Sequence, residues 1–368
     1  MAKYFFIAGE ASGDKHAAEL MKQIRIQDPQ AQYIGLGGDQ MVAAGCHLYQ
    51  HIRHMTFMGF AAVLSNLGQV RRNFRIAKET LLTEQPDVLI LIDYPSFNLR
   101  MAQFCRKHLP ATKIYYYIPP KVWAWKSWRV HRIARLCDEV LGIFPFEPAF
   151  YARYGYRCTY VGHPTVEEIE EGDRLKVKGE RDKTIAILPG SRPSEIKHCL
   201  PKMLAAARRF PDYRIVVSAA PGIEDTFYTP YLCEKDTLTR DTYSAVQQAA
   251  AAVVNSGTAT LETALLACPQ VAVYHLACAR LLGWLRWAQS LVFSIRYFTP
   301  VNIIAGKEVI KECLADDFTV EKVTQELEHI LTDEAYKKEM LAHYEHLHTL
   351  LGTQSASVTA AQIITSRP

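Results

Sequence analysis

The sequence predicts an α/β protein with two Rossmann-like domains that face each other across a cleft. Three observations support this class. Short apolar segments alternate with segments of helical period along the chain, the pattern of parallel strands joined by crossover helices. The apolar segments are nearly continuous, as in strands buried on both faces of a sheet. The length of 368 residues suits two domains, at roughly 100–200 residues each.

The expected elements follow the order strand, helix, strand. The clearest strands are residues 4–8, 32–36, 88–92, 113–118, 140–144 and 159–161, then 184–188, 214–219, 251–254 and 270–274. Helical periods are clearest over 67–83, 101–108, 195–209, 243–250 and 320–331. Each half begins with a strand, a glycine turn and a helix, over 7–14 and 187–195. Ligands of open α/β sheets bind beyond the carboxyl ends of the strands, so we expect the chemistry in the cleft.

A charge-rich segment divides the chain. Residues 167–183 read EEIEEGDRLKVKGERDK and contain few core-forming side chains. We therefore expect a first domain over 1–166, a second domain over 167–345, and a C-terminal helix over 346–368 that can pack back on the first domain.

Composition excludes several classes of protein. Apolar residues make up 49% and charged residues 22% of the chain, which excludes a disordered, collagen-like or disulfide-stapled protein. The nine cysteines include no C-x-x-C pair and indicate reduced thiols in a cytosolic protein. No apolar run reaches the roughly 18 residues of a membrane span. The apolar run at the N-terminus is too short for a signal peptide.

Charge is unevenly distributed between the halves. Residues 1–165 contain 20 Lys and Arg against 12 Asp and Glu, whereas the remaining residues contain 22 against 26. A basic first half indicates an anionic partner. Charge alone leaves nucleic acid, an acidic membrane surface and a phosphorylated substrate as alternatives.

Two turns of the first half are candidate sites. Residues 8–14, AGEASGD, follow an apolar strand and open a helix, and their glycines permit close backbone approach. In the plainer interpretation, Ser12 or Asp14 only caps the helix. Asp93 ends the most apolar strand, where partial desolvation can raise its pKa toward the range of a general base. A turn or cap ahead of Pro95 is an equal alternative.

Aromatic and apolar segments suggest further contacts. Trp123, Trp125 and Trp128 fall within six residues, which favours stacking on bases or sugars, or anchoring at a lipid interface, over simple packing. Residues 56–67, TFMGFAAVLSNL, carry no charge and lead into Arg71 and Arg72. This is the pattern of a helix lying in an anionic membrane surface, although the segment alone favours a buried core helix. Residues 280–296 repeat the pattern.

The second half contains two turns suited to phosphate. Arg192 follows a Gly-Ser turn and can clamp a diphosphate with its planar guanidinium, unless the turn is simply a surface loop. Residues 253–262, VVNSGTATLE, predict a strand, a turn and a helix whose first amides suit phosphate. Glu262 is then within reach of a ribose diol, or it only favours the helix N-terminus by its charge.

No metal site is predicted. His343, His346 and His348 lie on one expected helix, where a solvated face is the preferred interpretation. The sequence also has no G-x-S-x-G and no G-x-x-x-x-G-K-[ST] motif, so the hydrolase and P-loop classes lose support.

Taken together, the ordered motifs resemble the lipid-A-disaccharide synthases, GT-B glycosyltransferases of Gram-negative bacteria. They cover nearly the whole chain, and their order is far more specific than any single motif. The matching segments are AGEASGD (8–14), MG (58–59), IDYPSFN (92–98), VWAW (122–125), FPFE (144–147), VGH (161–163), LPGSR (188–192), SGTATLE (256–262) and NIIAG (302–306).

The resemblance implies a reaction and a GT-B fold. UDP-2,3-diacylglucosamine would transfer its sugar with inversion to 2,3-diacylglucosamine 1-phosphate, also called lipid X. The products would be lipid A disaccharide 1-phosphate and UDP, and neither a metal nor another cofactor would be required.

The resemblance also implies site residues. Asp93 would be the catalytic base. The residues implied in UDP binding are Arg192, Ser256, Gly257, Thr258, Thr260, Glu262 and Asn302. Those implied in acceptor binding are Gly9, Glu10, Ser12, Gly13, Asp14, Asn98, Trp123 and Trp125. Those implied in membrane insertion are Phe57, Met58, Phe60, Val63, Leu64 and Leu67. The protein would therefore be cytoplasmic, at the surface of the inner membrane, with acylated glucosamines and not nucleic acid as its partners.

Three residues depart from the family pattern. The family commonly has the sequence DAPDFN, in which this chain replaces the alanine by Tyr94 and the second aspartate by Ser96. In the loop where the family commonly has PSVWAW, this chain has Lys121. Any role of the second carboxylate is absent here, so Asp93 alone carries the base assignment. The acyl-chain preference stays open.

Two other functions are alternatives. Another UDP-sugar enzyme of GT-B type, such as a peptidoglycan glycosyltransferase or a UDP-N-acetylglucosamine 2-epimerase, shares the layout but lacks the combination of 92–98 with 122–125. A nucleic-acid-binding protein would leave the two phosphate turns of the acidic half unexplained. The oligomeric state is also open, with a homodimer as one alternative.

Overall fold

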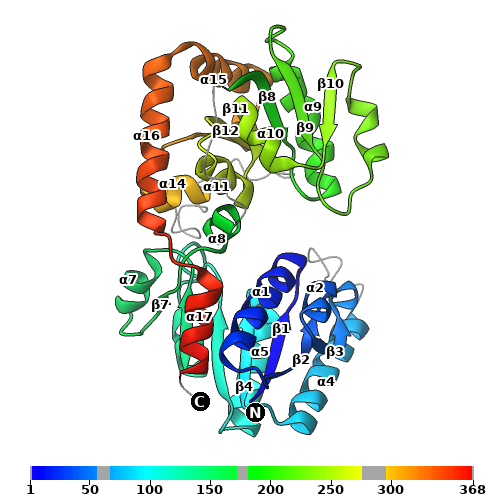
Figure 1. Cartoon of the computed structure of the whole chain (residues 1–368), viewed down its shortest axis with the longest axis vertical. Coiled ribbons are helices and arrows are strands. Elements are labelled where there is room, and N and C mark those ends of the chain that lie inside the picture. Colours follow the sequence, from blue (N-terminus) through cyan, green and yellow to red (C-terminus); the bar gives the residue numbers. More distant parts are fainter. Residues whose placement is uncertain (1, 56–66, 172–180, 276–295, 367–368) are drawn as a thin grey trace. The chain divides into compact units, whose positions relative to one another are not determined.

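The chain forms two compact α/β units. The computed structural model describes residues 2–55, 67–171, 181–275 and 296–366. The first unit is Met1–Pro164 together with Gln354–Pro368, and the second is Thr165–Thr353. Each unit contains one sheet whose described strands are all parallel (Figure 1). The division falls at 164/165, two residues before the boundary expected from the sequence.

The sheet of the first unit has the strand order β3-β2-β1-β4-β5-β6-β7. The order changes direction between β1 and β4, so the connections after these two central strands diverge and leave a crevice at their carboxyl ends. All five residues of β4 are buried, as the continuous apolar sequence VLILI predicts for a central strand. The strands are β1 (Lys3–Ala8), β2 (Gln32–Gly37), β3 (Cys46–His51), β4 (Val88–Ile92), β5 (Lys113–Tyr117), β6 (Glu139–Gly142) and β7 (Thr159–Tyr160).

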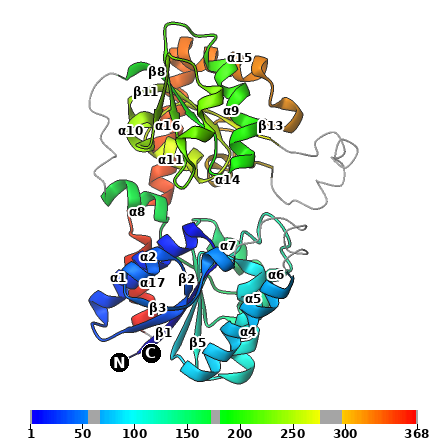
Figure 2. The ribbon, with the colours of Figure 1, turned by 90° about the vertical axis from the view of Figure 1, so that its right-hand side faces the viewer.

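Helices cover both faces of this sheet. In Figure 2, α1 and α17 lie on one face and α4, α5 and α6 on the other. The last helix packs on the first, and Thr365 Oγ1 donates a hydrogen bond of 2.5 Å to Gln27 Oε1. The helices are α1 (Ala11–Gln27), α2 (Asp39–Ala43), α4 (Leu67–Glu84), α5 (Pro95–His108), α6 (Arg129–Leu136), α7 (Glu147–Ala152) and α17 (Ala356–Thr365), with a 3₁₀ turn η1 (Ile52–His54).

The sheet of the second unit has the order β10-β9-β8-β11-β12-β13 and changes direction between β8 and β11. The strands are β8 (Asp182–Leu188), β9 (Arg214–Ser218), β10 (Asp236–Thr239), β11 (Ala249–Asn255), β12 (Gln270–Tyr274) and β13 (Lys311–Leu314). The α-helices are α8 (Pro164–Glu171), α9 (Pro193–Ala207), α10 (Thr242–Gln248), α11 (Thr258–Leu265), α14 (Pro300–Ala305), α15 (Val320–Thr332) and α16 (Glu334–Leu351). The 3₁₀ turns are η2 (Asp225–Phe227), η3 (Thr229–Tyr231) and η4 (Ala315–Asp317).

Two expectations about element boundaries are wrong. The single C-terminal helix expected over 346–368 is broken: α16 ends at Leu351, Gly352 has φ +67°, and the Ser355 hydroxyl accepts a hydrogen bond from the Val358 N–H to begin α17. Residues 346–351 therefore belong to the second unit. The helix expected to reach residue 250 stops at Gln248, because Ala249 already pairs with β8.

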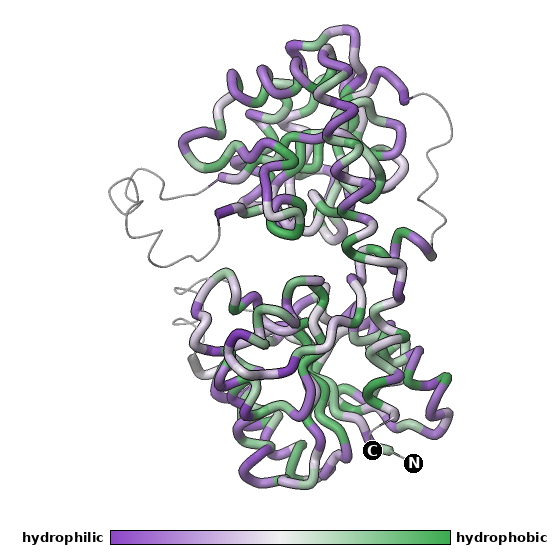
Figure 3. Tube along the Cα trace, turned by 90° about the vertical axis from the view of Figure 1, so that its left-hand side faces the viewer, coloured by the Kyte–Doolittle hydropathy of each residue, from purple (hydrophilic) through white to green (hydrophobic). Residues whose placement is uncertain are grey.

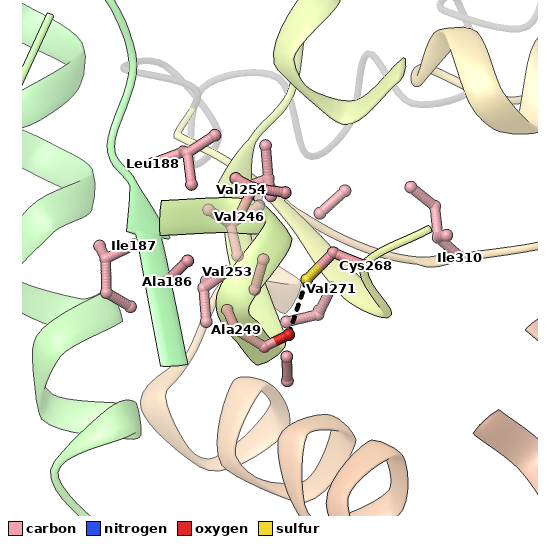
Figure 4. Packing of buried hydrophobic residues seen from close by; sticks show 14 of the residues in the cluster. Ala186, Ile187, Leu188, Val246, Ala249, Val253, Val254, Cys268, Val271 and Ile310 are labelled. Atoms are coloured by element: carbon pink, nitrogen blue, oxygen red, sulfur yellow. Dashed lines mark hydrogen bonds between the residues drawn. The ribbon is translucent and has the colours of Figure 1, made fainter. Parts of the chain in front are cut away.

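Apolar residues gather in the strands and on the helix faces that cover them (Figure 3). Figure 4 shows the core of the second unit, where Ile187 and Leu188 of β8 pack beside Val253 and Val254 of β11. The Cys268 thiol in this core donates a hydrogen bond of 3.6 Å to the Ala249 carbonyl. Among the described helices, none has the length and apolar character needed to cross a membrane.

Candidate active site

The carboxyl ends of three central strands bring the predicted acceptor residues together in the first unit. Ala8 at the end of β1 is in register with Ile92 at the end of β4, and Ile92 is in register with Tyr117 at the end of β5. The Gly9 turn, the Asp93 turn and the loop that follows β5 are therefore neighbours at the crevice of the sheet.

Asp93 lies in an unusual turn. Asp93 and Tyr94 both have left-handed backbone conformations, with φ +44° and +45°, and Ile118, directly after the adjacent strand β5, has φ +57°. Such conformations are uncommon for residues other than glycine, and a β-branched residue is a clear outlier. Three of them beside one another indicate backbone strain that the surrounding structure must hold in place.

The Asp93 carboxyl suits a proton acceptor. Its side chain is exposed to solvent at the end of the strand. Neighbouring protein atoms nevertheless partly desolvate the carboxyl group. Desolvation raises its pKa above the ordinary range, while the Lys121 charge and a hydrogen bond from the Tyr94 N–H oppose that rise. A carboxylate that is accessible and has a raised pKa is a stronger base than an ordinary aspartate.

The residues after β1 have different roles from one another. A Cβ at Gly9 would come within 2.2 Å of the Tyr94 ring, so only glycine permits this contact with the Asp93 turn. The Tyr94 hydroxyl donates a hydrogen bond of 3.0 Å to the Met55 carbonyl. Burial and then the nearby Glu10 charge raise the pKa of Tyr94, which places Glu10 at the same turn.

Asp14 supports the backbone rather than facing the crevice. Its carboxyl is 3% exposed and accepts hydrogen bonds from the N–H groups of Gly38, Gln40 and Met41 at 2.7, 3.0 and 3.1 Å. Asp14 lies in α1, but its carboxyl therefore caps the N-terminus of α2. Ser12 is exposed, and Gly13 is buried with its α-carbon facing Ala8 and Ile92.

Asn98 is fully buried directly behind Asp93. Its Nδ2 donates hydrogen bonds of 3.1 and 2.8 Å to the carbonyls of Ile92 and Asp93. The structure thus brings Asn98 to Asp93 as a support for its turn, and an acceptor contact from Asn98 stays a prediction.

The three tryptophans divide into one buried ring and two exposed rings. Trp123 is 8% exposed, and its ring lies edge-on to Phe144 and Phe146. Trp125 is 45% and Trp128 60% exposed, with the Lys126 ammonium 3.8 Å from the Trp125 ring centroid. Only the exposed pair is available for stacking or for a lipid interface.

Glu147 is a buried acid beside the predicted acceptor residue Trp123, and sequence reasoning assigned it no role. It is fully buried and accepts hydrogen bonds from the N–H groups of Ile143, Phe144 and the Trp123 indole at 2.8, 3.0 and 3.1 Å. Burial raises its pKa to about 7 against the opposing effect of those donors and of Lys121. A single acid inside the apolar segment FPFE is the signal that could have identified it.

His163 is a second buried ionisable group of this unit. Burial, and after it the neighbouring His16 and Lys121, lower its pKa to about 3. His163 is therefore neutral at physiological pH, and its ring lies edge-on to Phe144. The motif VGH had marked the position without revealing that it is buried.

In the second unit, the two predicted phosphate turns are adjacent. Val254 near the end of β11 is in register with Leu188 at the end of β8. Gly190 has φ +110°, where a side chain would meet Glu195 and Asn255. Glu195, which sequence reasoning missed, accepts hydrogen bonds from the Ser191 N–H at 3.1 Å and from Arg192 Nη1 at 3.0 Å. The Arg192 side chain is half exposed.

The turn before α11 exposes its first residues. Gly257 and Thr258 are exposed at the start of this helix, where the first N–H groups have no intrahelical acceptor. Ser256 uses its N–H in a hydrogen bond of 2.7 Å to the Val273 carbonyl, and the buried Thr260 uses its hydroxyl in one of 2.8 Å to the Gly257 carbonyl. Glu262 follows in the second turn and is half-buried.

Asn302 is fully buried and saturated with protein hydrogen bonds. Its Nδ2 donates to the Ile310 carbonyl and to Glu312 Oε1 at 2.8 and 2.9 Å, and its Oδ1 accepts from the N–H groups of Val309 and Ile310 at 2.7 and 3.0 Å. A UDP contact would require Asn302 to give up one of these bonds, so its role in UDP binding stays a prediction.

We expect Asn302→Ala to affect stability more than nucleotide binding. Its buried partners would lose their hydrogen bonds, at a cost of about 2–4 kcal/mol in the free energy of unfolding. UDP affinity of the folded variant should change less than about threefold. Urea unfolding and calorimetric titration with UDP measure the two effects. Normal stability with a loss of UDP affinity above tenfold would contradict the structural role and support a nucleotide contact.

Most residues predicted to enter a membrane lie outside the described residues, namely Phe57, Met58, Phe60, Val63 and Leu64. Leu67 is the first residue of α4.

A basic groove of about 830 Å³ lies between α4 and α5. The Arg100 guanidinium lies over the Phe74 ring and the Lys78 ammonium over the Phe104 ring, each 5.3 Å from the centroid. The lining is completed by Arg71, Arg75, Glu79, Leu82, Gln103, Lys107 and His108.

Known structures resemble the whole chain in fold. A putative UDP-N-acetylglucosamine 2-epimerase from Listeria monocytogenes aligns over 99% of this chain and 96% of its own, with a TM-score of 0.65 at 11% identity. The calicheamicin glycosyltransferase CalG4 aligns over 100% and 98%, with a TM-score of 0.60 at 13% identity. At such low identity the likeness establishes the fold, which is the two-domain GT-B arrangement of parallel sheets expected from the sequence.

Sequence comparison resolves the family. The sequence model described as lipid-A-disaccharide synthetase matches residues 4–365. The lipid-A-disaccharide synthase of Myxococcus xanthus is 35% identical over 97% of this chain and 95% of its own length. That of Geobacter sulfurreducens is 33% identical over 98% and 96%. With matches of this identity over nearly the full length of both chains, the protein belongs to the lipid-A-disaccharide synthase family.

Proposed function

We propose that this protein transfers a diacylglucosamine from its UDP donor to the 6-hydroxyl of 2,3-diacylglucosamine 1-phosphate, with inversion and without a metal ion. The observation that carries the proposal is the Asp93 turn: an accessible carboxylate with a raised pKa at the crevice of the first sheet. Membership of the lipid-A-disaccharide synthase family supports the proposed substrate class.

The proposed mechanism is a single displacement. The Asp93 carboxylate takes the proton of the acceptor hydroxyl as its oxygen forms a bond to the anomeric carbon of the donor. The bond from that carbon to the diphosphate oxygen breaks on the opposite face, and UDP leaves with the electron pair. One displacement inverts the anomeric configuration and requires no glycosyl-enzyme intermediate.

The second unit would stabilise the leaving group. The half-exposed Arg192 guanidinium can pair with the diphosphate, and the exposed start of α11 at Gly257 and Thr258 presents backbone amides to an anion. The two turns are neighbours at the ends of β8 and β11. Together they provide the charge stabilisation that a divalent cation supplies in other transferases.

One assay tests the proposal as a whole. The purified full chain is incubated in detergent with UDP-2,3-diacylglucosamine and 2,3-diacylglucosamine 1-phosphate, with EDTA or with Mg²⁺, and the products are identified by mass spectrometry and by the anomeric coupling constant in NMR. We expect a β-linked disaccharide phosphate to form at the same rate with EDTA and with Mg²⁺. No disaccharide would refute the reaction, an α-linkage would refute inversion, and activity only with Mg²⁺ would refute metal independence.

The groove between α4 and α5 supports a membrane-surface location. Five Lys and Arg side chains and one glutamate line it, together with the Phe74 and Phe104 rings. A cationic surface with aromatic residues is attracted to anionic headgroups. Both proposed substrates carry acyl chains, so an enzyme that acts on them benefits from binding where they reside. We therefore propose peripheral binding to the anionic cytoplasmic membrane surface through this face.

We expect the double variant Arg71→Glu and Arg75→Glu to bind anionic vesicles at least about tenfold more weakly, since each cation near a membrane contributes about 1 kcal/mol. Co-sedimentation with phosphatidylcholine vesicles containing phosphatidylglycerol, at low and high salt, measures the partition. Lys235→Glu with Lys338→Glu, two exposed positions of the second unit, is the control with the same change in charge. Equal losses in both double variants would indicate an effect of net charge and contradict a specific membrane face.

A further inference from the structure

The strained turn at Asp93 is held by side chains on two other elements. The Asp93 carbonyl accepts hydrogen bonds from the Tyr116 hydroxyl at 2.7 Å and from Asn98 Nδ2 at 2.8 Å. The Asp93 N–H donates to the Ile118 carbonyl at 3.2 Å. The N–H and the carbonyl of Asp93 therefore both have defined partners, which come from β5, from the residue after β5 and from α5.

The strain explains why such support is needed. Two consecutive non-glycine residues in left-handed conformations cost of order 1–3 kcal/mol each, and they persist only when neighbouring contacts hold them. Without the hydrogen bonds to its carbonyl, the peptide after Asp93 could rotate toward an ordinary conformation. The carboxylate would then move relative to the crevice, because it is attached to the same α-carbon.

Tyr116 is well suited to this support. It is the fourth of the five residues of β5, its side chain is fully buried, and its ring belongs to the apolar core of the first unit. Burial raises the pKa of its hydroxyl well above 10, so it remains a neutral donor throughout the physiological range. The ring is held by packing, and the hydroxyl reaches the carbonyl of Asp93, which directly follows the adjacent strand β4.

We infer that Tyr116 is a positioning residue for the proposed reaction: its hydroxyl, together with Asn98, fixes the strained Asp93 turn and so aims the carboxylate at the acceptor hydroxyl. This inference rests on the proposed function, since it gives Tyr116 a role only if Asp93 is the base. Nothing in the family motifs had marked Tyr116, which lies in the run Tyr115-Tyr116-Tyr117 of a buried strand.

The decisive variant is Tyr116→Phe, which keeps the packed ring and removes one donor. We expect kcat to fall by about 10- to 100-fold, because a displacement near 1 Å from the reacting geometry can cost about 100-fold. KM for both substrates should stay within about twofold, since Tyr116 touches neither. The acid limb of the kcat profile should move to lower pH, because a carboxylate released from its turn becomes better solvated.

Tyr151→Phe is the matched control. Tyr151 is also a fully buried tyrosine of the first unit, on α7, but its hydroxyl has no hydrogen-bond partner in the described parts of the chain. Removing that hydroxyl leaves no acceptor unsatisfied, so kcat and its pH profile should match the wild type. Thermal unfolding of both variants checks that each is folded.

The outcomes separate the inference from the function on which it rests. A wild type that forms no disaccharide overturns both. A wild type that is active, an Asp93→Asn variant that is impaired and a Tyr116→Phe variant with the expected kcat loss support the inference. If the wild type is active and Asp93→Asn is impaired, a Tyr116→Phe variant that retains kcat within about twofold overturns the inference. A Tyr116→Phe variant that fails to fold also overturns it. So does a loss of kcat that is proportional to a lowered melting temperature and leaves the pH profile unmoved.

Discussion

Asp93→Asn is expected to lower kcat by about 10²–10⁴-fold, the usual contribution of a general base. Asparagine cannot take the acceptor proton, but it is among the residues that best tolerate a left-handed backbone, so the turn should survive. The carboxyl also accepts a hydrogen bond from the Tyr94 N–H, which an amide oxygen can still accept. UDP binding should remain normal, because Arg192 and α11 belong to the other unit.

The pH dependence gives this prediction a second readout. Desolvation raises the pKa of Asp93, so the base is protonated and inactive at pH values where an ordinary aspartate is ionised. Activity of the wild type should therefore fall as pH decreases through a pKa above 3.8, the ordinary value for this group. Initial rates at saturating substrates across pH measure this limb, which should be absent from the residual activity of Asp93→Asn.

Asp87→Asn is the matched control for this variant. Asp87 is an exposed aspartate that directly precedes β4, whereas Asp93 directly follows it. Its carboxyl accepts a hydrogen bond from the Lys3 N–H at the amino-terminal ends of β1 and β4, whereas Asp93 lies at the carboxyl end of β4. We expect wild-type kcat for Asp87→Asn. Retention of kcat within about threefold in Asp93→Asn would exclude Asp93 as the base.

Glu147→Gln is expected to change how the stability of the first unit depends on pH. Burial raises the pKa of Glu147 to about 7, from an ordinary value of 4.5. The folded state therefore binds this proton more tightly than the unfolded state. Its contribution to stability is complete below about pH 4.5 and is lost as pH rises through about 7, by up to about 3 kcal/mol.

The comparison of two proteins isolates this contribution. Urea unfolding of wild type and Glu147→Gln between pH 4.5 and 8, followed by tryptophan fluorescence, gives the difference in their free energies of unfolding. Glutamine does not titrate, so the free energy of unfolding of the wild type should decrease relative to that of Glu147→Gln as pH rises. The buried His163 acts in the opposite direction, because its lowered pKa removes stability as pH falls below 6.5, but it is present in both proteins. Parallel stability curves would contradict the raised pKa of Glu147.

The sequence by itself determined the fold class, the approximate division into two units and the family. Continuous apolar strands such as VLILI predict a sheet that is buried on both faces. The turns after β1, β4, β8 and β11 contain the motifs that resemble those of the family. Motif order along the chain is a property of the sequence, so no packing information was needed to recognise the family.

Only the tertiary structure decided what each motif residue does. Asp14 and Asn302 belong to motifs, yet their polar atoms bond to backbone groups that are distant in sequence or placed by another element. Trp123 and Trp125 are two residues apart in one motif, but one ring is buried on Glu147 and the other is exposed. Tyr116 has no motif, and its hydrogen bond to the Asp93 carbonyl joins residues 23 positions apart. Such roles depend on burial and on contacts between neighbouring strands, which local sequence patterns do not encode.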